Sequence, residues 1–506
     1  MSKFKSVLPS PAAAAVLVAA VILALALFAW PMGMADNGDF FRMIHGNGLY
    51  KLDQHQDDAY FNYFSQTFGR YEYFNESGES LLSSQTPFIK GAMALDNLLT
   101  GGDNVFDIRF LALPMALWAL LAIYMLVDWA SWGQKKRDGY IIAALAVYFF
   151  ADTGYAVYFN SFYAEGLVLV SFLTAMASAL LLEQKRYNPY LMLGVFLVSG
   201  VVLTSAKQQN APLGFLLGIL SLLMALGHSG YKLSQEKGGS WLRKNLFSKV
   251  AAFGAVLLCF TGWAVYALIP QEFVYINQYH AMTRGVMMTS ENPETVLEEF
   301  DMDPQYSLVD QTIYFERYPA ADVESKELKE RFYSHYGFVS ISAYYITHPG
   351  QLLQMLDYSA QSANAIRPAV IGNYQRNAGK AAAAQTQFFT LHSSLKEAFT
   401  PHTVGFMILW VAVAIGVSFT KRWRTTVLAC AILMGFSQIG TSIVGAGDAD
   451  LSKHIFLYNV ASDFTLYVLL ASVLIPWIAR RTAKSKAKPQ VVVAEKEAVL
   501  VGGGNI

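Results

Sequence analysis

An acidic motif followed by an arginine comes directly after the first long apolar run of the chain. It reads Ala35-Asp36-Asn37-Gly38-Asp39-Phe40-Phe41-Arg42. Asn37 and Gly38 favour a turn, which would let Asp36 and Asp39 face one cavity. A carboxylate at the edge of a low-dielectric region can have its pKa raised into the range of a general base, with Arg42 as counter-charge or phosphate ligand. A solvated helix end with an Asx turn explains the same residues equally well.

A second polar motif comes just before a later apolar run. It reads Asp152-Thr153-Gly154-Tyr155-Ala156-Val157-Tyr158-Phe159-Asn160-Ser161-Phe162-Tyr163-Ala164-Glu165. We expect Glu165 to lie within or just above a membrane span, where an ionisable side chain is costly and therefore indicates a functional residue. The aromatic residues of the motif are more typical of an interfacial aromatic belt.

A third motif is a polar break between two short apolar runs. It reads Thr204-Ser205-Ala206-Lys207-Gln208-Gln209-Asn210-Ala211-Pro212. Such a break is tolerated at membrane depth only where it lines a protein or water-filled cavity, and a lysine with amide neighbours suits an anionic phosphate. An exposed hairpin between two spans is the alternative interpretation.

The fourth motif combines carboxylates with a lysine and a histidine. It reads Gly445-Ala446-Gly447-Asp448-Ala449-Asp450-Leu451-Ser452-Lys453-His454. Lys453 and His454 could bind a phosphate or diphosphate group, or the segment could be an ordinary polar loop. No His or Cys spacing in it resembles a zinc site, and a metal site made only of oxygen ligands cannot be recognised without geometry.

The composition excludes an ordinary soluble protein. Of the 506 residues, 54% are hydrophobic and 15% are charged, whereas a soluble domain carries roughly 25% charged residues. Lys plus Arg and Asp plus Glu are 37 each, so the chain has no basic excess and no electrostatic footprint of a nucleic-acid binder. Cys259 and Cys430 lie in apolar runs and read as small hydrophobic residues, not as a disulfide framework.

Apolar segments long enough to cross the bilayer recur along the chain, so we predict an all-α polytopic membrane protein with about ten transmembrane helices. The predicted spans are Ala12 to Trp30, Val105 to Val127, Tyr140 to Phe150, Tyr163 to Leu182, Tyr190 to Leu203, Pro212 to Leu226, Val250 to Ile269, Thr403 to Phe419, Thr425 to Val444 and Val460 to Ile478.

The basic residues predict the orientation of these spans. When the ten spans cross the membrane in alternating directions, the basic segments that flank them all lie on one side. By the positive-inside rule this side is the cytoplasm, and both termini lie there. All four motifs then lie on the opposite, outer side. Gly33-Met34-Ala35 has the spacing of a signal-peptidase site, but the preceding apolar run is long for a signal peptide, so we favour a retained first span.

Two long segments remain outside the spans, residues 31–104 and 270–402, and both are predicted to face outward. We divide the chain into an N-terminal transmembrane catalytic module (1–269), a small, mostly helical extracytoplasmic domain (270–402), C-terminal transmembrane helices (403–479) and a disordered cytoplasmic tail (480–506).

The order and common sidedness of the four motifs resemble the GT-C class of glycosyltransferases, and in particular the hexosyltransferases of bacterial surface-layer and cell-envelope glycan assembly. The resemblance implies a location in the bacterial cell membrane, a polyprenyl-phosphate-linked sugar donor, and a glycan or lipid-linked acceptor at the outer face. It also implies an inverting transfer with one carboxylate base.

The resemblance assigns roles to individual residues. Either Asp36 or Asp39 is implied to be the base, and Glu165 and Asp152 are implied to orient the acceptor or a metal ion. The residues implied to bind substrate or its phosphate are Arg42, Asn160, Tyr163, Lys207, Gln208, Asp448, Lys453 and His454. The chain lacks an adjacent Asp-Glu pair and a clean D-x-D, which leaves open whether a divalent cation such as Mg or Mn takes part.

Other classes share parts of this pattern. A flippase or transporter of a lipid-linked saccharide would also have many spans, broken helices and intramembrane charges. An envelope-glycan polymerase or ligase would share the large outer loop but would be expected to rely on arginines in it. A noncatalytic scaffold would leave the clustered outer carboxylates unexplained.

Overall fold

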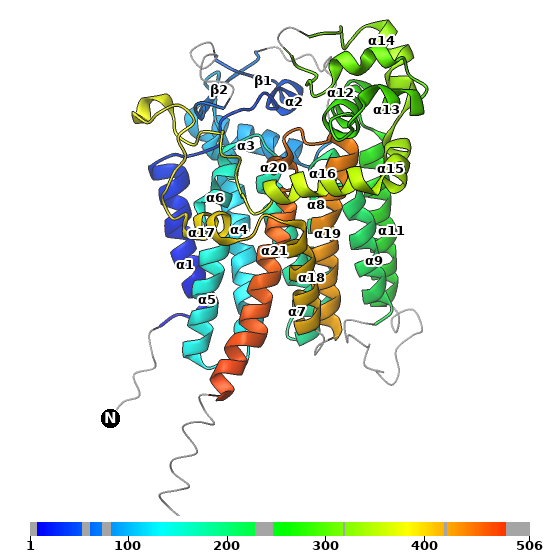
Figure 1. The fold of residues 1–506 in the computed structure, drawn as a ribbon. Helices are drawn as coiled ribbons and strands as arrows, with labels where there is room; N and C mark the ends of the chain where they lie inside the picture. Colours follow the sequence, from blue (N-terminus) through cyan, green and yellow to red (C-terminus); the bar gives the residue numbers. More distant parts are fainter. Residues whose placement is uncertain are drawn as a thin grey trace, which may run out of the picture.

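The computed structural model describes residues 8–52, 61–72, 82–227, 246–316, 319–418 and 422–481. Long helices lie side by side in one bundle, and shorter helices and a few strands gather at one end of it, which we call the cap end (Figure 1). The predicted disordered tail, 480–506, lies outside the described residues except for its first two positions.

The bundle is built from the apolar runs of the sequence. Its helices are α1 (Pro11–Ala24, prolonged by the π-helical turn η1, Leu25–Ala29), α4 (Arg109–Ser131), α5 (Lys136–Phe150), α7 (Glu165–Gln184), α8 (Pro189–Ser205), α9 (Ala211–Ala225), α11 (Leu246–Ala267), α18 (Val404–Ser418), α19 (Arg422–Ala446) and α21 (Phe456–Leu469, followed by the π-helical turn η10, Leu470–Leu474). Every residue of α7 from Glu165 to Leu182 is buried, so α7 is a central helix surrounded by others.

Several of these helices begin with strong local signals. The Ser10 side chain accepts a hydrogen bond from the backbone N–H of Ala13 at 3.2 Å, and Pro11 occupies the first turn of α1. Asn188 caps α8 in the same way, with Pro189 next to it. A polar cap followed by proline satisfies free N–H groups at the helix start and sets its first turn.

Seven helices of the described residues are long and apolar enough to cross a membrane, and the number rises to nine if each of two bent pairs is one span. One pair is α5 with Thr153–Asn160, bent by 45°, and the other is Leu391–Phe399 with Val404–Val417, bent by 117°. The remaining predicted span is α8, an apolar helix of 17 residues. The chain is therefore an all-α integral membrane protein with multiple spans, and the count lies slightly below the predicted one.

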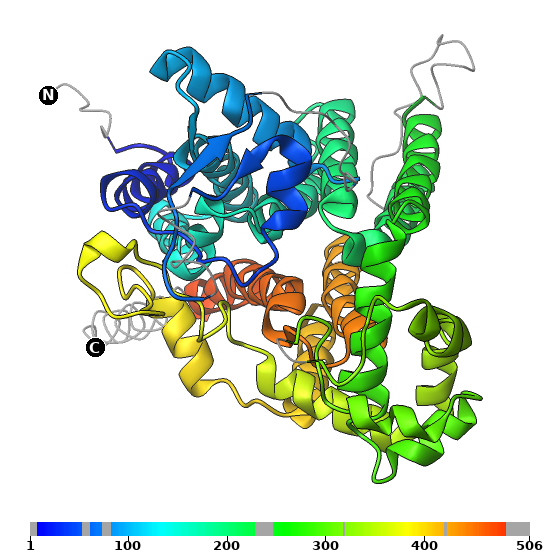
Figure 2. The same ribbon diagram turned by 90° about the horizontal axis from the view of Figure 1, so that it is seen from above.

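The two ends of the bundle differ in what they carry. α1 begins, and the helix that contains α21 ends, at the end of the bundle opposite the cap end (Figure 1). The cap end carries the described residues of 31–108 and most of the described residues of 270–402 (Figures 1 and 2). The described parts of both long polar segments thus lie mainly at one end of the bundle, and the assignment of that end to the cell exterior stays a prediction from charge.

The shorter elements lie around the cap end of the bundle, apart from α17, which lies beside the bundle (Figure 1). They are α2 (Phe41–Ile44), η2 (His45–Asn47), β1 (Leu49–Tyr50), β2 (Thr67–Arg70), α3 (Gln85–Thr100), β3 (Val105–Asp107), α6 (Thr153–Ala156), η4 (Val157–Asn160), η5 (Gln208–Asn210), α12 (Gln271–Ala281), η6 (Met282–Val286), α13 (Pro293–Glu299), η7 (Pro304–Val309), α14 (Lys326–Arg331), η8 (Tyr333–His335), α15 (Phe338–Thr347), α16 (Pro349–Ser362), η9 (Arg376–Ala378), α17 (Leu391–Phe399) and α20 (Leu451–His454).

A small antiparallel sheet in the order β1-β2-β3 was not expected from the sequence. Phe68 of β2 lies opposite Phe106 of β3, and both are buried. The second predicted span was placed from Val105, but the helix begins only at Arg109. The reason is that the Val105–Asp107 stretch pairs with β2, and the Asp107 carboxylate then accepts the backbone N–H of Arg109 at 2.9 Å.

Residues 271–363 have a second hydrophobic core, rich in tyrosine and phenylalanine. The Phe332 ring packs edge-on against Tyr306 and Tyr336. The same core includes Ile439 and Ile443 of α19, so it is continuous with the cap end of the bundle. This attachment holds α12, η6 and α16 beside residues 447–455, which connect α19 to α21 and which we call the last loop.

Helix α17 is amphipathic and lies beside the bundle (Figure 1). Leu391, Leu395 and Phe399 are exposed on one face, while His392 and Lys396 are buried on the other. Leucine and phenylalanine spaced four residues apart on an exposed face are typical of a helix that lies in a membrane interface.

Candidate active site

The side chains of Asp39 and Lys453 form an ion pair at the cap end of the bundle. Lys453 has 7% of its side chain exposed and Asp39 has 25%. The Arg42 guanidinium lies 3.3 Å from the other carboxylate oxygen of Asp39. One partly accessible carboxylate is therefore held between two cations.

These neighbours determine the charge of the pair. Burial by itself raises the pKa of Asp39, but the charges of Lys453 and Arg42 outweigh it and hold that pKa well below its ordinary value. Burial lowers the pKa of Lys453, and the charges of Asp39 and Asp450 more than compensate, so that this pKa is raised. The expectation of a raised pKa is thus wrong for Asp39, because Lys453, which is distant in sequence, contacts it together with the neighbouring Arg42.

Asp36 has a different position from Asp39. One of its oxygens accepts hydrogen bonds from the backbone N–H groups of Gly38 at 2.7 Å and Phe40 at 3.1 Å, and the other pairs with Lys51. Gly38 has a φ of 107°, which favours glycine. Asp36 therefore closes the turn that presents Asp39, which is the Asx-turn alternative considered from the sequence.

Tyr163 holds the same turn, residues 36–39, through two hydrogen bonds. Its buried hydroxyl donates to the carbonyl of Ala35 at 2.9 Å and accepts the backbone N–H of Asn37 at 2.8 Å. The Lys453 ammonium lies 5.3 Å from the centre of its ring, within cation–π range. Tyr163 thus joins the first motif to the fourth.

A second link between these motifs runs through Asp450. Its carboxylate accepts a hydrogen bond from the Asn37 side chain at 2.8 Å and lies 3.3 Å from the Lys453 ammonium. Asp450 has a positive φ of 50°, a backbone shape that aspartate tolerates better than most residues. The turn at Asp450 starts α20 and directs Lys453 towards Asp39.

Glu165 and Lys207 form another ion pair, 2.8 Å long. Glu165 is the first residue of α7 and is buried, while Lys207 keeps 19% of its side chain exposed. The charge of Glu165 also raises the pKa of Lys453, so the two pairs lie within one electrostatic environment. We call Asp39, Arg42, Glu165, Lys207, Asp450 and Lys453 together the charge cluster.

His454 borders the charge cluster through Gln209. The Gln209 amide donates to the backbone carbonyl of His454 at 2.9 Å, and its oxygen lies 3.0 Å from Nδ1 of the ring. Burial, together with the charges of Lys207 and Lys453, lowers the pKa of His454 well below its ordinary value. The ring is therefore neutral near pH 7 and can donate or accept a hydrogen bond without adding charge.

Arg284 connects the 270–402 segment to this site. Its Nε and one terminal nitrogen both contact the Asp448 carboxylate at 2.7 Å, a bidentate arrangement. The Arg42 guanidinium also lies 5.1 Å from the centre of the ring of Phe273, a residue of α12. Helix α12 and the turn η6 thus form one wall of the site.

Two residues expected in the site lie elsewhere. Asp152 caps α6, and its oxygens accept hydrogen bonds from the Gly154 N–H at 2.7 Å and from the N–H and hydroxyl of Ser393 at 3.0 and 2.7 Å. Asn160 is fully buried and donates to the carbonyls of Leu27 and Met32, where the first span ends. Both side chains bind neighbouring structural groups and do not contact the charge cluster.

A second buried polar group lies next to Asp152 and was not anticipated. Asp463 of α21 contacts His392 at 2.7 Å, Lys396 at 2.8 Å and the Tyr155 hydroxyl at 2.5 Å. These contacts attach the buried face of α17 to α6 and α21. The sequence showed Asp463 as a lone acid in an apolar run, so its position was a signal, but its partners were not visible.

Other contributors were missed for a similar reason. Gln209, and not the predicted Gln208, makes the contact with His454, although both belong to the third motif. Asp450 was in the fourth motif without an assigned role. Arg284 had no local signal, because only the fold brings it beside Asp448.

The residues of the site do not suit a divalent cation. In the described part of the chain, no group of three or more His, Cys, Asp or Glu side chains is arranged to hold one. The Asp39 carboxylate is also contacted by Arg42 and Lys453, and cations next to a carboxylate oppose the binding of another cation.

Fold and site together define a membrane protein with multiple spans and a cluster of paired charges at one end of its helix bundle. The chain belongs to the family described as the YfdI N-terminal transmembrane domain, which matches residues 1–491. No match was found among curated proteins.

The solved structures give a distant similarity. The apo oligosaccharyltransferase of Archaeoglobus fulgidus is 13% identical over 96% of this chain and 53% of its own, with a TM-score of 0.36. The oligosaccharyltransferase AglB of the same organism, in complex with an inhibitory peptide and a dolichol-phosphate, is 13% identical over 94% of this chain and 56% of its own, with a TM-score of 0.32. The chain thus spans little more than half the length of these proteins.

Proposed function

We propose that the protein is a GT-C-type hexosyltransferase of the bacterial cell membrane. It transfers a hexose from a polyprenyl-phosphate donor to a cell-envelope glycan at the outer face, with inversion at the anomeric carbon. The observation that carries this proposal is Asp39, a partly accessible carboxylate held between Lys453 and Arg42 where the helices reach the cap end. One carboxylate beside several cations suits a reaction that needs one base and releases a phosphate.

The confinement of the donor explains the position of the charges. A polyprenyl chain keeps the sugar phosphate at the membrane surface, so the groups that bind the phosphate must lie where spans meet the cap. Lys207 and Arg42 have 19% and 26% of their side chains exposed, and both can contact a phosphate there. Lys453 is more deeply buried, and its attraction for an anion is accordingly less screened.

Donor binding would prepare Asp39 for its role as base. In the free protein the pKa of Asp39 is held low, which makes it a weak base. A phosphate that contacts Arg42 and Lys453 draws these cations away from the carboxylate, and the pKa of Asp39 rises. Asp39 would therefore become a stronger base once the donor is bound.

In the transfer step, Asp39 takes the proton of the acceptor hydroxyl. The acceptor oxygen forms a bond to the anomeric carbon while the bond from that carbon to the phosphate oxygen breaks on the opposite face. The electron pair leaves with the polyprenyl phosphate, which Lys453, Arg42 and Lys207 stabilise. Glu165 positions Lys207 through their 2.8 Å ion pair. Asp36 stabilises the turn that presents Asp39, the base.

The experiment is a transfer assay in membranes that contain or lack the protein, with a radiolabelled polyprenyl-phosphate hexose as donor. The proposal predicts label in the envelope glycan only when the protein is present, and an anomer opposite to that of the donor. A retained anomer would contradict the single-base mechanism, and absence of transfer would contradict the function.

A flippase of a lipid-linked saccharide is the second candidate, and the two bent helix pairs favour it. Broken helices are common in transporters. Movement of the donor across sealed vesicles without transfer to glycan would support this alternative over the transferase.

A further inference from the structure

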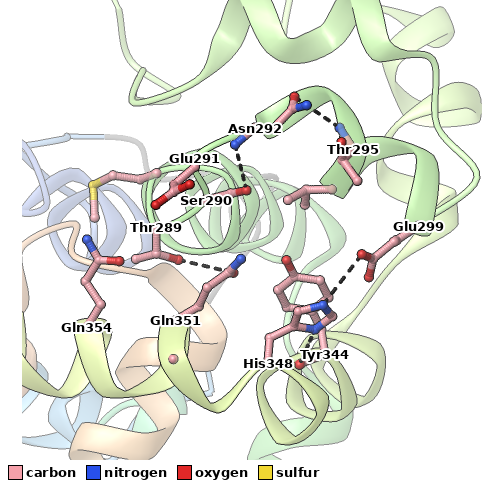
Figure 3. Close-up of a pocket in the computed structure, with 13 residues that line it drawn as sticks. Thr289, Ser290, Glu291, Asn292, Thr295, Glu299, Tyr344, His348, Gln351 and Gln354 are labelled. Atoms are coloured by element: carbon pink, nitrogen blue, oxygen red, sulfur yellow. Dashed lines mark hydrogen bonds and ion pairs between the residues drawn. The ribbon is translucent and has the colours of Figure 1, made fainter.

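A cavity of about 590 Å³ lies at the cap end, between the residues that follow η6 and the helices α13 and α16 (Figure 3). This volume is within the range of roughly 300–1,000 Å³ that is typical of small-molecule sites. The cavity is separate from the charge cluster, because none of the residues that line it belongs to that cluster.

Planar polar side chains surround the cavity from two sides. Glu291 and Glu299 come from the α13 side, and Gln351 and Gln354 come from the first turns of α16 (Figure 3). The Gln351 side chain contacts the Thr289 hydroxyl through its oxygen at 3.5 Å and the Tyr344 hydroxyl through its amide group, which leaves one N–H and one lone pair for a ligand. Carboxylates and amides together can accept from and donate to several hydroxyl groups at once.

The charge of the lining selects against anions. None of the described residues that line the cavity is a lysine or an arginine, and two are glutamates. A phosphate would meet repulsion here, whereas a neutral polyhydroxyl compound would not. The cavity and the charge cluster therefore suit different parts of a substrate.

A pair of stacked rings closes one side of the cavity. The His348 and Tyr344 rings are 4.0 Å apart and nearly parallel, and His348 is also 3.5 Å from the Glu299 carboxylate. His348 is the more exposed of the two, so its ring offers a flat face supported by Tyr344. A flat ring beside hydrogen-bonding groups matches a sugar, which has an apolar face and a polar edge.

The cavity and the candidate active site are joined by one segment of the chain. Thr289 follows η6, the turn that carries Arg284 and its bidentate contact with Asp448. Gly285 of the same turn packs so closely on Gly447 that an added Cβ would lie 3.2 Å from the Gly447 Cα. One short segment thus contacts Gly447 and Asp448, which precede Asp450 of the charge cluster, and leads directly into the wall of the cavity.

We infer that this cavity binds neutral sugar residues of the acceptor glycan. The acceptor role rests on the proposed function, but saccharide binding itself does not. Acceptor recognition away from the base would let the protein select a glycan before its hydroxyl reaches Asp39.

The test is binding of the purified full chain, in detergent and without donor, to an array of neutral and anionic oligosaccharides. We expect the wild type to bind neutral members, and Gln351→Ala and His348→Ala each to weaken that binding at least tenfold. Gln361→Ala is the matched control, because it removes an exposed amide on α16 outside the cavity. Thermal unfolding of each variant shows whether the fold is kept.

Three outcomes would overturn the inference: no binding of any neutral saccharide by the wild type, binding of anionic saccharides only, or unchanged binding by both folded cavity variants. Saccharide binding that depends on Gln351, combined with no hexose transfer in the membrane assay, would retain the cavity as a saccharide site and refute the transferase. Transfer by a protein whose cavity variants keep the wild-type acceptor KM would support the transferase and refute the acceptor role of the cavity.

Discussion

The Asp39 carboxylate and the Lys453 ammonium form an ion pair although 414 positions separate them in the chain. The pair joins the turn after the first span to the short helix before the last one. Every span from the second to the penultimate lies between them in sequence, so the pair forms only when the bundle has closed. This dependence makes the charge cluster sensitive to the packing of the whole protein.

Lys453→Gln should move the acid limb of the transfer reaction to higher pH. Asp39 stays ionised below its ordinary pKa because Lys453 and Arg42 stabilise the anion, so loss of Lys453 raises the pKa of Asp39 towards the ordinary carboxyl range. The pH profile of kcat/KM reports ionisations of the free enzyme and is the measurement. An acid limb unchanged by Lys453→Gln would contradict the assigned pairing.

The same pair should make stability depend on pH. Because the folded pKa of Asp39 is depressed, its contribution to stability is present above the unfolded pKa and is lost as the pH falls through the folded value. Wild-type protein should therefore lose more stability on acidification than Asp39→Asn, measured by thermal unfolding in detergent.

Gly447→Ala should impair both folding and transfer. Gly447 has a φ of 62°, and a Cβ there would lie 2.3 Å from the carbonyl oxygen of Arg284. The substitution should separate η6 from the last loop and cost more than about 1 kcal/mol of stability. Gly445→Ala is the matched control, since a Cβ at Gly445 meets nothing within 4 Å. Equal melting temperatures for the two variants would argue against the close contact.

Asp463→Asn should destabilise the protein. This effect does not depend on any role of Asp463 in transfer. The substitution leaves Lys396 buried beside His392 with no carboxylate, and breaking a buried pair of this kind costs roughly 3 kcal/mol. Asp357→Asn, at an exposed position, should change stability little. The double variant Asp463→Asn with Lys396→Met should be more stable than Asp463→Asn alone; if it is less stable, the pair is not the source of the effect.

Cysteine labelling should place the cap end outside the cell. In a background with Cys259→Ser and Cys430→Ala, Glu324→Cys should react with an impermeant maleimide in intact cells. Lys135→Cys, at the opposite end of the bundle, should react only after permeabilisation. Labelling of both positions from one side would refute the topology, and the reverse pattern would place the charge cluster in the cytoplasm.

The bundle was largely predictable from the sequence because lipid requires long apolar helices, and their runs are visible without any partner. Short segments that pair with a distant part of the chain could not be predicted in this way. Val105–Asp107 was assigned to a span, yet Phe106 lies in a sheet opposite Phe68.

The site was predictable only in part, for the same physical reason. Motifs located Asp39, Glu165, Lys207 and Lys453, since charges beside spans are conspicuous. The choice of partners depends on tertiary packing, so the sequence could not distinguish Asp36, which holds a turn, from Asp39, which faces Lys453. It also placed Asp152 with the site, whereas its carboxylate binds Ser393.

We propose that Asp39 is the base and that Asp36 supports its turn. The decisive measurement is transfer from a polyprenyl-phosphate hexose under single-turnover conditions, with Asp39→Asn and an exposed control, Asp103→Asn. We expect a rate loss of about 10² or more for Asp39→Asn at normal protein levels and donor binding, and wild-type transfer for Asp103→Asn. Wild-type transfer by Asp39→Asn would contradict it.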